Sequence, residues 1–484
     1  MPAPKEGPPL AADEVDFASW ESFPASDSPP WTLGASPPPE EHHSTRTERD
    51  SMGEVQVPAG VLYGPQTQRA VENFAVGNYR LQRQFIEALG LIKACAAKAN
   101  GELSVVPADL ASAVEAAATA IAEGQYFDQF VVNVFQTGSG TSTNMNANEV
   151  IASLSRTHPN DHVNHSQSSN DVIPAAIHIA AALDVHRVLL PTMTDLQAAF
   201  EAKAKEFWGV VKVGRTHLQD ATPIRLGEEF SGYGHQVKSS AARIKAACEG
   251  LLELPLGGTA VGTGVNAPNG FGARVTEFIA QRTGLAFREA ENHFEAQAAK
   301  DAILFLSGAL RTYAVALTKI ANDIRWLGSS GIDELRLPSM QPGSSIMPGK
   351  VNPVIPESVL MICAQVIGHD AAITWGCAGG NFELNTMMPL LAYDLLDSLE
   401  LLSAGTRNFT TRCIHGLEAN GRHRRQPLEH ATAMATALAM EIGYDQAASI
   451  AKEASDTGKT IRELAAQRSG LTEQKLDELF HGVQ

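Results

Sequence analysis

Five long segments with apolar residues at helical spacing occupy most of the second half of the chain and leave few folds open. Helices of twenty to thirty-five residues are about 30 to 50 Å long at ~1.5 Å per residue. Because these segments carry apolar stripes and few internal breakers, they favour a long helical bundle. The absence of strand–helix alternation disfavours a doubly wound sheet. The segments span approximately residues 174–208, 225–252, 296–327, 354–374 and 388–411.

Shorter periodic segments flank this region. Before it, helices are expected from about residue 67 and over 83–99, 107–123 and 147–154. After it, glycines break the tail into shorter helices. We therefore predict an N-terminal helical domain over 46–167, a central bundle over 168–411 and a small C-terminal domain over 412–484.

The first fifty residues differ in composition. They hold ten of the 26 prolines and ten acidic against three basic residues. Such composition cannot bury a core, so we interpret residues 1–45 as a disordered acidic leader. Trp20, Phe23 and Trp31 could form a docking motif, although a nonfunctional tail is the better explanation of them.

Charge and cysteine usage exclude several functional classes. The formal net charge of −17 argues against a nucleic-acid partner and against binding to a membrane surface. Five scattered cysteines without a C-x-x-C pair suggest reduced thiols. We expect no segment to be apolar enough to span a bilayer, because charged residues and histidines interrupt the best candidate. The N-terminus also lacks the pattern of a secretory leader. We therefore expect a cytoplasmic protein without nucleic-acid or membrane partners.

The stretch Gly343–Glu357 gathers reactive groups in a segment rich in glycine and proline. It carries the hydroxyls of a Gly-Ser-Ser loop, then Lys350 and Asn352, which an extended backbone would point to the same side. Pro353 and Glu357 suit the opening of a helix. Composition alone favours a surface loop beside a capped helix.

Three further segments carry possible chemistry. In Gln136–Asn148, small hydroxylated residues surround two glycines just before a helix, as in an anion cradle; a capped helix start also fits. In His158–Asp171, three histidines and aspartates suggest a metal, but their spacing matches no standard ligand set and their Asn and Ser neighbours favour carboxylate recognition. Gly214–Pro223 holds His217 in an expected loop, where a lone histidine is more often structural than catalytic.

Together these segments resemble the fumarase/aspartase superfamily. Gly-Ser-Ser-Ile-Met-Pro-Gly-Lys-Val-Asn-Pro, residues 343–353, is similar to its signature. His217 within Thr-His-Leu-Gln-Asp and the Gly-Ser-Gly-Thr of residues 138–141 resemble the class II fumarase branch, because aspartases carry Gln and Gly-Ala-Gly-Thr there. The resemblance extends from about residue 46 to residue 480.

The resemblance implies a mainly α, three-domain fold with a central long-helix bundle. It implies a homotetramer with a twenty-helix core, whose active sites each draw loops from three subunits. The implied activity is the reversible hydration of fumarate to L-malate, a step of the tricarboxylic acid cycle. The substrate is a small dicarboxylate, and no cofactor or metal is required.

Residue roles also follow from the resemblance. Ser344 matches the proton-abstracting base, His217 the group that acts on water, and Glu357 the residue that orients His217. The positions that match substrate binding are Ser139, Gly140, Thr141, Ser168, Ser169, Asn170, Thr216, Ser345, Lys350 and Asn352. A second dicarboxylate site outside the active site matches His158, Pro159, Asn160 and Asp161.

Alternatives remain at this stage. An aspartate ammonia-lyase of the same fold is the closest rival; argininosuccinate and adenylosuccinate lyases fit the motifs less well. A noncatalytic structural or interaction protein that reuses the fold is a third possibility. One departure from the family stands out: the loop after Trp326 reads Gly-Ser-Ser-Gly-Ile-Asp, shorter than usual and without the usual arginine. The packing of that loop, and a substrate-side charge, are therefore in question.

Overall fold

The structure, a computed structural model, describes residues 44–343, 346–347, 349–420 and 434–481. The proposed leader therefore lies outside the described residues except for its last two positions. Ser344 and Ser345 also lie outside them. Within the described part, helices dominate and strands occur in two-stranded sheets.

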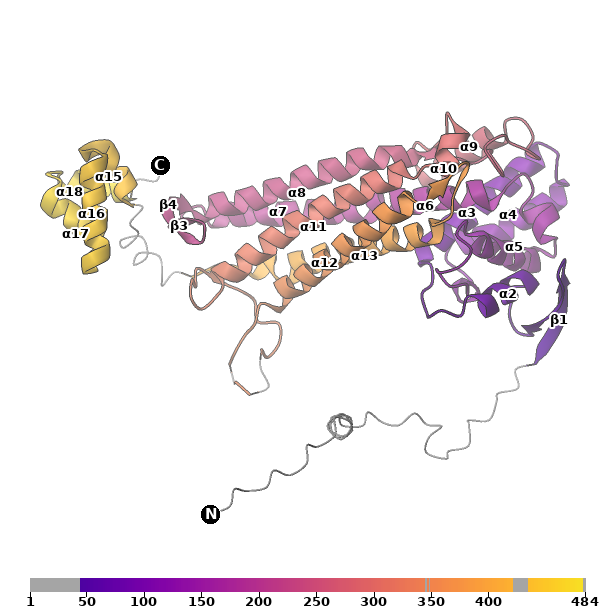
Figure 1. Ribbon diagram of the computed structural model, residues 1–484, viewed down its shortest axis with the longest axis horizontal. Coiled ribbons are helices and arrows are strands. Elements are labelled where there is room, and N and C mark those ends of the chain that lie inside the picture. The colour runs from indigo at the N-terminus through magenta and orange to yellow at the C-terminus, as the bar shows by residue number, and fades with distance from the viewer. Residues whose placement is uncertain (1–43, 344–345, 348, 421–433, 482–484) are drawn as a thin grey trace, which may run out of the picture.

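A bundle of long helices forms the body of the molecule (Figure 1). Around the bundle, α7 packs on α8, α8 on α11, α11 on α12, α12 on α13, and α13 back on α7. The predicted mainly α fold with a central long-helix bundle is thus confirmed. The bundle elements are α6 (Ser169–Asp184), η4 (Val185–Leu189), α7 (Leu190–Glu206), α8 (Leu226–Cys248), α11 (Asp301–Leu327), α12 (Val354–Cys377) and α13 (Met388–Arg412).

Three helix starts differ from the prediction, and one is that of α5 (Thr141–Ser155), which begins at Thr141 rather than near residue 147. The first bundle helix begins at Ser169 rather than near residue 174, because Ser168 and Asp171 form a capping box at its start. The helix expected over 296–327 is wrong at its beginning: α10 (His293–Ala298) ends, and α11 starts at Asp301. At the break, the buried ammonium of Lys300 donates hydrogen bonds to the carbonyls of Gln297 (2.6 Å) and Ala299 (2.9 Å).

The N-terminal helices cover one end of the bundle. A hairpin that the sequence analysis did not predict opens this part; its first strand includes Thr45, which had been assigned to the leader. Helix α3 packs on α4, α6 and α9, while α5 packs on α2 and α4. The elements are β1 (Thr45–Asp50), β2 (Gly53–Pro58), α2 (Pro65–Asn73), α3 (Arg83–Glu102), α4 (Ala108–Ala122), α5 (Thr141–Ser155) and α9 (Phe271–Thr283).

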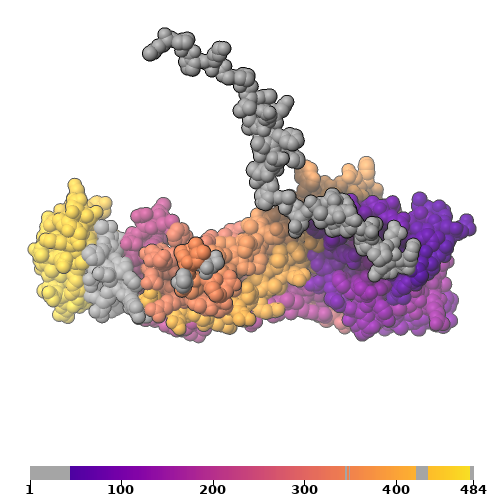
Figure 2. All heavy atoms as spheres, turned by 90° about the horizontal axis from the view of Figure 1, so that it is seen from below, coloured from indigo at the N-terminus to yellow at the C-terminus, as the bar shows by residue number. Residues whose placement is uncertain are grey.

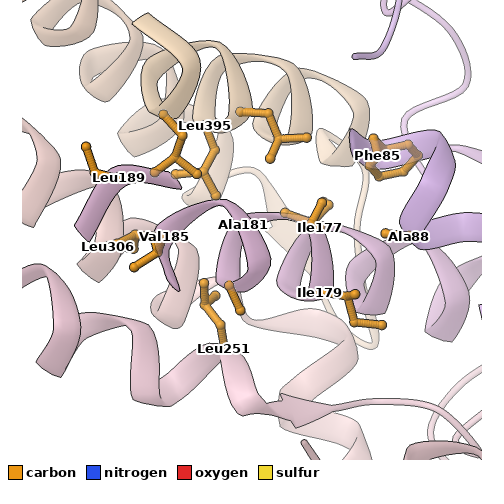
Figure 3. Close-up of a cluster of buried hydrophobic side chains, with 14 of the residues drawn as sticks. Phe85, Ala88, Ile177, Ile179, Ala181, Val185, Leu189, Leu251, Leu306 and Leu395 are labelled. Atoms are coloured by element: carbon orange, nitrogen blue, oxygen red, sulfur yellow. The ribbon is translucent and has the colours of Figure 1, made fainter. Parts of the chain in front are cut away.

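One continuous hydrophobic core joins the N-terminal helices to the bundle. Helix α6 lies at its centre and is buried on nearly all sides, so apolar residues surround it (Figure 3). Full burial of each large apolar side chain contributes about 1.5–3 kcal/mol. The labelled side chains come from α3, α6 and the helices around them: Phe85, Ala88, Ile177, Ile179, Ala181, Val185, Leu189, Leu251, Leu306 and Leu395. The predicted boundary at 167/168 stays a prediction.

A second, smaller core belongs to the C-terminal helices, and Val213 of β3 joins it. These helices lie at the opposite end of the molecule from the N-terminal part (Figures 1 and 2). They are α15 (Ala435–Ile442), α16 (Tyr444–Thr457), α17 (Ile461–Arg468) and α18 (Glu473–His481).

The remaining strands pair locally. Antiparallel pairs are formed by β3 (Val211–Thr216) with β4 (Gln219–Arg225), β7 (Leu335–Arg336) with β10 (Glu418–Ala419), and β8 (Gly380–Asn381) with β9 (Leu384–Asn385). A parallel pair is formed by β5 (Glu253–Leu254) and β6 (Arg288–Glu289).

Three helical stretches are long and apolar enough to cross a membrane by length and composition alone: Ser169–Glu206, Asp301–Leu327 and Val354–Cys377. The sequence-based judgement that no segment reaches this level was therefore wrong. The bundle gives a physical reason for their composition, because a helix packed among other helices needs apolar residues over much of its circumference. The share of the apolar window that is buried falls from 72% in the first stretch to 39% in the last.

Candidate active site

Two helix N-termini meet at one end of the bundle and bring six predicted substrate-binding residues together. Ser139 and Thr141, at the start of α5, share a hydrogen bond of 2.7 Å between their hydroxyls. The Thr141 hydroxyl is also 2.7 Å from that of Ser169, in the first turn of α6. Ser168 and Asn170 flank Ser169, and Asn170 Nδ2 donates to the carbonyl of Ala260 (2.8 Å).

This convergence favours an anion. The N-terminus of each helix carries about +0.5 of an elementary charge and presents unpaired N–H groups. Gly140 precedes α5 with φ of 73°, in the left-handed region that glycine adopts without strain. Gly138 is equally constrained: a Cβ there would lie 1.7 Å from the carbonyl oxygen of Thr386, just before α13. The expected helix thus starts directly after the two glycines, while the binding of an anion there stays a prediction.

Sequence reasoning missed Asp171 and Lys93, which lie buried behind this cluster. Burial raises the pKa of the Asp171 carboxyl to about 6, although three backbone N–H donors and the charge of Lys93 oppose the shift. Burial lowers the pKa of the Lys93 ammonium to about 7. Lys93 Nζ donates to Asn164 Oδ1 (2.9 Å).

His217 lies at the tip of the β3–β4 hairpin rather than in an irregular loop, which corrects the prediction. Thr216 pairs with Gln219, so His217 and Leu218 form a two-residue turn with φ of 55° and 58°. Positive φ at both positions is the type I′ pattern, which usually requires Asn or Gly. Non-glycine residues in this region are strained, and such strain is often found at functional sites. Thr216 and His217 are both exposed.

A buried network of charges fixes the base of this hairpin. Lys212 Nζ lies 3.2 Å from carboxylate oxygens of both Glu229 on α8 and Glu334, and Arg215 Nη2 lies 2.8 Å from Glu334 Oε1. Glu334 follows the shortened loop after Trp326, which closes in a tight turn where Asp333 N donates to the carbonyl of Ser329 (2.7 Å). This turn is followed directly by Glu334, whose carboxylate contacts Lys212 and Arg215 at the base of the hairpin.

The loop that contains Ser344 is closed at its base by its own ends. Gly343 N donates to the carbonyl of Lys350 (2.8 Å), and Asn352 Nδ2 donates to the carbonyl of Gly343 (2.6 Å). A Cβ at position 343 would lie 2.4 Å from that Lys350 oxygen, so glycine is required there. Lys350 is exposed. Ser344 and Ser345 themselves lie outside the described residues.

Glu357 lies in the first turn of α12, as predicted, but its partner in the chain is Arg325 rather than His217. Arg325 Nη2 and Glu357 Oε1 are 3.8 Å apart. Among the residues that the structure describes, His217 makes no hydrogen bond. The predicted contact between Glu357 and His217 is therefore not formed within one chain.

The two groups of site residues are far apart within the chain. Residues Ser169–Glu206 form one helical run of 38 residues. Such a run is about 57 Å long. The Ser139–Asn170 cluster lies at its start, whereas His217 follows shortly after its end. The cluster therefore cannot reach His217 in the same molecule.

The turn at His158–Asp161 is separate from both groups. It lies beyond the C-terminal end of α5, whereas Thr141 lies at the beginning of that helix. His158 Nδ1 accepts hydrogen bonds from the N–H groups of Asn160 (3.3 Å) and Asp161 (3.0 Å), and Pro159 begins a short π-helical turn. The side chains of His158 and Asp161 are exposed to solvent. Within the described ranges, no group of three or more His, Cys, Asp or Glu side chains is arranged to hold a metal ion.

Comparisons with known proteins identify the family of the chain. The lyase family profile matches residues 53–368, and that of the fumarase C C-terminus matches residues 434–482. A class II fumarate hydratase from Mycobacterium tuberculosis is 53% identical over 432 residues, covering 87% of this chain and 91% of the relative. The mitochondrial fumarate hydratase of Rattus norvegicus is 48% identical and covers 90% and 89%.

Solved structures of class II fumarase and of a fumarate lyase have the same fold as this chain. A class II fumarase from Schistosoma mansoni superimposes with a TM-score of 0.88 at 37% identity, covering 90% of this chain and 98% of the other. A fumarate lyase:delta crystallin from Brucella melitensis, bound to cobalt, superimposes with a TM-score of 0.87 at 43% identity, with the same coverage.

Proposed function

This chain belongs to the class II fumarase family, and we propose that it completes its active sites by bringing together opposite ends of neighbouring copies. It is a lyase whose activity is the reversible hydration of fumarate to L-malate, and the aspartate ammonia-lyase alternative is not favoured. Its substrate is a small dicarboxylate, and the protein is an oligomer. The observation that carries the proposal is the 38-residue helical run between Ser169 and Glu206, which keeps the two groups of site residues apart.

The exposed side of α12 supports self-association. Met361, Ala364, Gly368, Ala371 and Trp375 follow one another at spacings of three and four residues, and all are uncharged and exposed. Residues at this spacing form one stripe along a helix, as in helices that pack on another helix. The small residues at the centre of the stripe permit close approach of a second helix. Met361 and Trp375 are 68% and 78% exposed, respectively. We propose that this α12 seam packs against other copies in a homotetramer.

The proposed mechanism starts from bound L-malate. Ser344, as an oxyanion, removes a proton from the carbon next to one carboxylate. The electron pair left on that carbon spreads into the carboxylate and forms a dianionic aci-carboxylate. His217 then gives a proton to the hydroxyl on the neighbouring carbon, which leaves as water, and the carbon–carbon double bond of fumarate forms. Glu357 from another copy orients the ring of His217.

Electrostatic stabilisation of the aci-carboxylate is the largest contribution in this scheme, since the proton removed is only weakly acidic. The chain has a net charge of −17, so positive potential must be supplied locally. We propose that the N-termini of α5 and α6 and the exposed ammonium of Lys350 supply it. Thr216, Ser345 and Asn352 would complete the contacts to the carboxylates. No step of this scheme requires a metal or a cofactor.

Mixing two inactive variants tests whether sites are shared. His217→Asn and Ser344→Ala should each be nearly inactive, because each removes one group that handles a proton. If the two residues of a site come from different subunits, random mixing after dissociation and reassembly restores about a quarter of the wild-type sites. If they come from one subunit, the mixture stays inactive and the shared-site proposal fails. Each variant dissociated and reassembled alone is the control.

We also propose a cytoplasmic location. All five cysteines are free thiols, and four of them are buried. Unpaired cysteines are typical of reducing compartments. Fractionation of cells with an antibody to the protein would test this; recovery with an exported or membrane fraction would contradict it.

A further inference from the structure

The Asp171 carboxylate joins two segments that are distant in the sequence. Its Oδ1 accepts a hydrogen bond from Ser168 N (2.9 Å), which completes the capping box of α6. Its Oδ2 accepts from Gly257 N (3.1 Å) and Thr259 N (3.0 Å). The side chain is fully buried, so water cannot replace these bonds.

The loop that Asp171 holds is strained. Thr259 has φ of 55°, which is costly for a β-branched residue, and its buried hydroxyl makes no hydrogen bond. Gln297 of α10 holds the same residue from the other side, since its Nε2 donates to the carbonyl of Thr259 (2.8 Å). Without these contacts the backbone at Thr259 would relax toward negative φ, which is favoured for a β-branched residue.

One hydrogen bond connects this loop to the substrate-binding cluster. The carbonyl of Ala260, next to Thr259, accepts from Asn170 Nδ2 at 2.8 Å. Asn170 N in turn donates to Ser168 Oγ (3.2 Å). Asp171 therefore controls both the first turn of α6 and the acceptor that orients the Asn170 amide.

The charge on Asp171 has a buried counter-ion. Lys93 acts on it electrostatically from α3, and its ammonium is held by Asn164 Oδ1, which also accepts from Asn144 Nδ2 and Asn148 Nδ2 at 3.1 Å each. A buried carboxylate needs such compensation to remain ionised. In its ionised form Asp171 can accept all three N–H groups at once.

We propose that Asp171 is a positioning residue for substrate: it holds the strained Gly257–Ala260 loop so that Ser168 and Asn170 are correctly placed for a carboxylate. This inference rests on the proposed function, in which Ser168 and Asn170 bind the dicarboxylate. It predicts a loss of substrate binding rather than of proton transfer, because the Asp171 carboxylate is engaged with backbone N–H groups of Ser168, Gly257 and Thr259.

Asp171→Asn tests the inference with almost no change in shape. The amide cannot accept on both sides, so either Ser168 N or the loop N–H groups lose their acceptor. The KM for L-malate should rise about ten- to a hundredfold, the equivalent of one lost charge-assisted hydrogen bond, while kcat changes little. An unchanged KM, with wild type active, would overturn the inference and leave the proposed function intact.

Glu149→Gln is the matched control. Glu149 is also a buried carboxylate that ties a helix N-terminus, accepting from Gly64 N (2.9 Å), Gln66 N (2.9 Å) and Thr67 N (3.1 Å). Glu149→Gln should lower the free energy of unfolding about as much as Asp171→Asn does, but it should leave the KM for L-malate unchanged. An equal rise in KM in both variants would show a merely structural effect and overturn the inference.

A second substitution provides a rescue that structural damage would not give. Glycine adopts positive φ freely, so Thr259→Gly removes the tendency of the loop to relax. In the Asp171→Asn background it should recover part of the lost affinity, and the absence of any recovery would overturn the role of the strained loop. If Asp171→Asn does not assemble, Gln297→Leu loosens the same loop from the other side and should raise KM in the same way; an unchanged KM there would overturn the inference. Inactivity of the wild type toward L-malate would refute the proposed function itself.

Discussion

Replacing Gly368 by leucine separates the folding of one chain from its assembly. Gly368 lies in the middle of the α12 seam, and a Cβ built there meets nothing within 4 Å. Nothing within the chain therefore requires glycine at this position. In an isolated chain, Gly368→Leu should even stabilise α12 by up to ~1 kcal/mol, because glycine is a poor helix former.

In the assembly, Gly368→Leu should destabilise rather than stabilise if a helix of another copy packs closely on the α12 seam. Overpacking a close contact by one large side chain costs about 1–3 kcal/mol. That cost weakens each contact about 5- to 150-fold, since ~1.4 kcal/mol is a factor of ten. A tetramer presents the seam four times, so the losses accumulate. Turnover should fall together with assembly, because each site in the proposed tetramer needs more than one subunit.

Light scattering after size-exclusion chromatography, over a range of concentrations, measures the effect. Gly232→Leu on α8 is the matched control, because a Cβ there also meets nothing and the surrounding exposed face carries Ser231 and His235. Wild type and Gly232→Leu should remain tetrameric at concentrations where Gly368→Leu dissociates. A Gly368→Leu variant that stays tetrameric, or equal dissociation of both variants, would refute the role of the α12 seam.

Three further predictions concern catalysis, the hairpin and pH. Ser344→Ala should abolish most turnover while light scattering shows an intact assembly; near-normal turnover would remove Ser344 as the base. Glu334→Gln should lower the free energy of unfolding by about 1.5–3 kcal/mol, because Lys212 keeps Glu229 as a counter-charge but the charge-assisted contacts of Lys212 and Arg215 to Glu334 are weakened; denaturant titration measures this, and a change below ~1 kcal/mol would contradict the network. Burial and the charges of Glu400 and Glu87 raise the pKa of Asp184 to about 7, so the folded chain keeps a proton that the unfolded chain releases near pH 4. The stabilisation from this proton is fully present below about pH 4 and is lost as pH rises through about 7, so wild type should lose stability between about pH 4 and pH 7 while Asp184→Asn loses less; equal losses would contradict the assignment.

The bundle could be predicted because its signal is local. Apolar residues at spacings of three and four mark each long helix, and the lengths of these helices place the Ser139–Asn170 cluster far from His217 before any coordinates are known. The start of α6 was misplaced because its capping box, formed by Ser168 and Asp171, lies inside a segment interpreted as a binding loop. The break before α11 depends on the way Lys300 folds back on α10, which no periodicity reveals.

The β3–β4 hairpin could not be predicted because its turn lacks the usual sequence signal. Two-residue hairpins are recognised by Asn-Gly or similar pairs, whereas His217 and Leu218 occupy these positions here. The candidate residues of the site came from short motifs and from resemblance to a family. Asp171 escaped notice because its partners, Gly257 and Thr259, are more than eighty residues away in the sequence.

The most direct test of the account is the ultraviolet absorbance of fumarate formed by the purified full chain from L-malate or L-aspartate, without added metal. Fumarate from L-malate alone, lost in both His217→Asn and Ser344→Ala, is the predicted result. Fumarate from L-aspartate alone would mean that His217 does not determine the reaction. No fumarate from either substrate would contradict the assignment of the chain as an active fumarate hydratase.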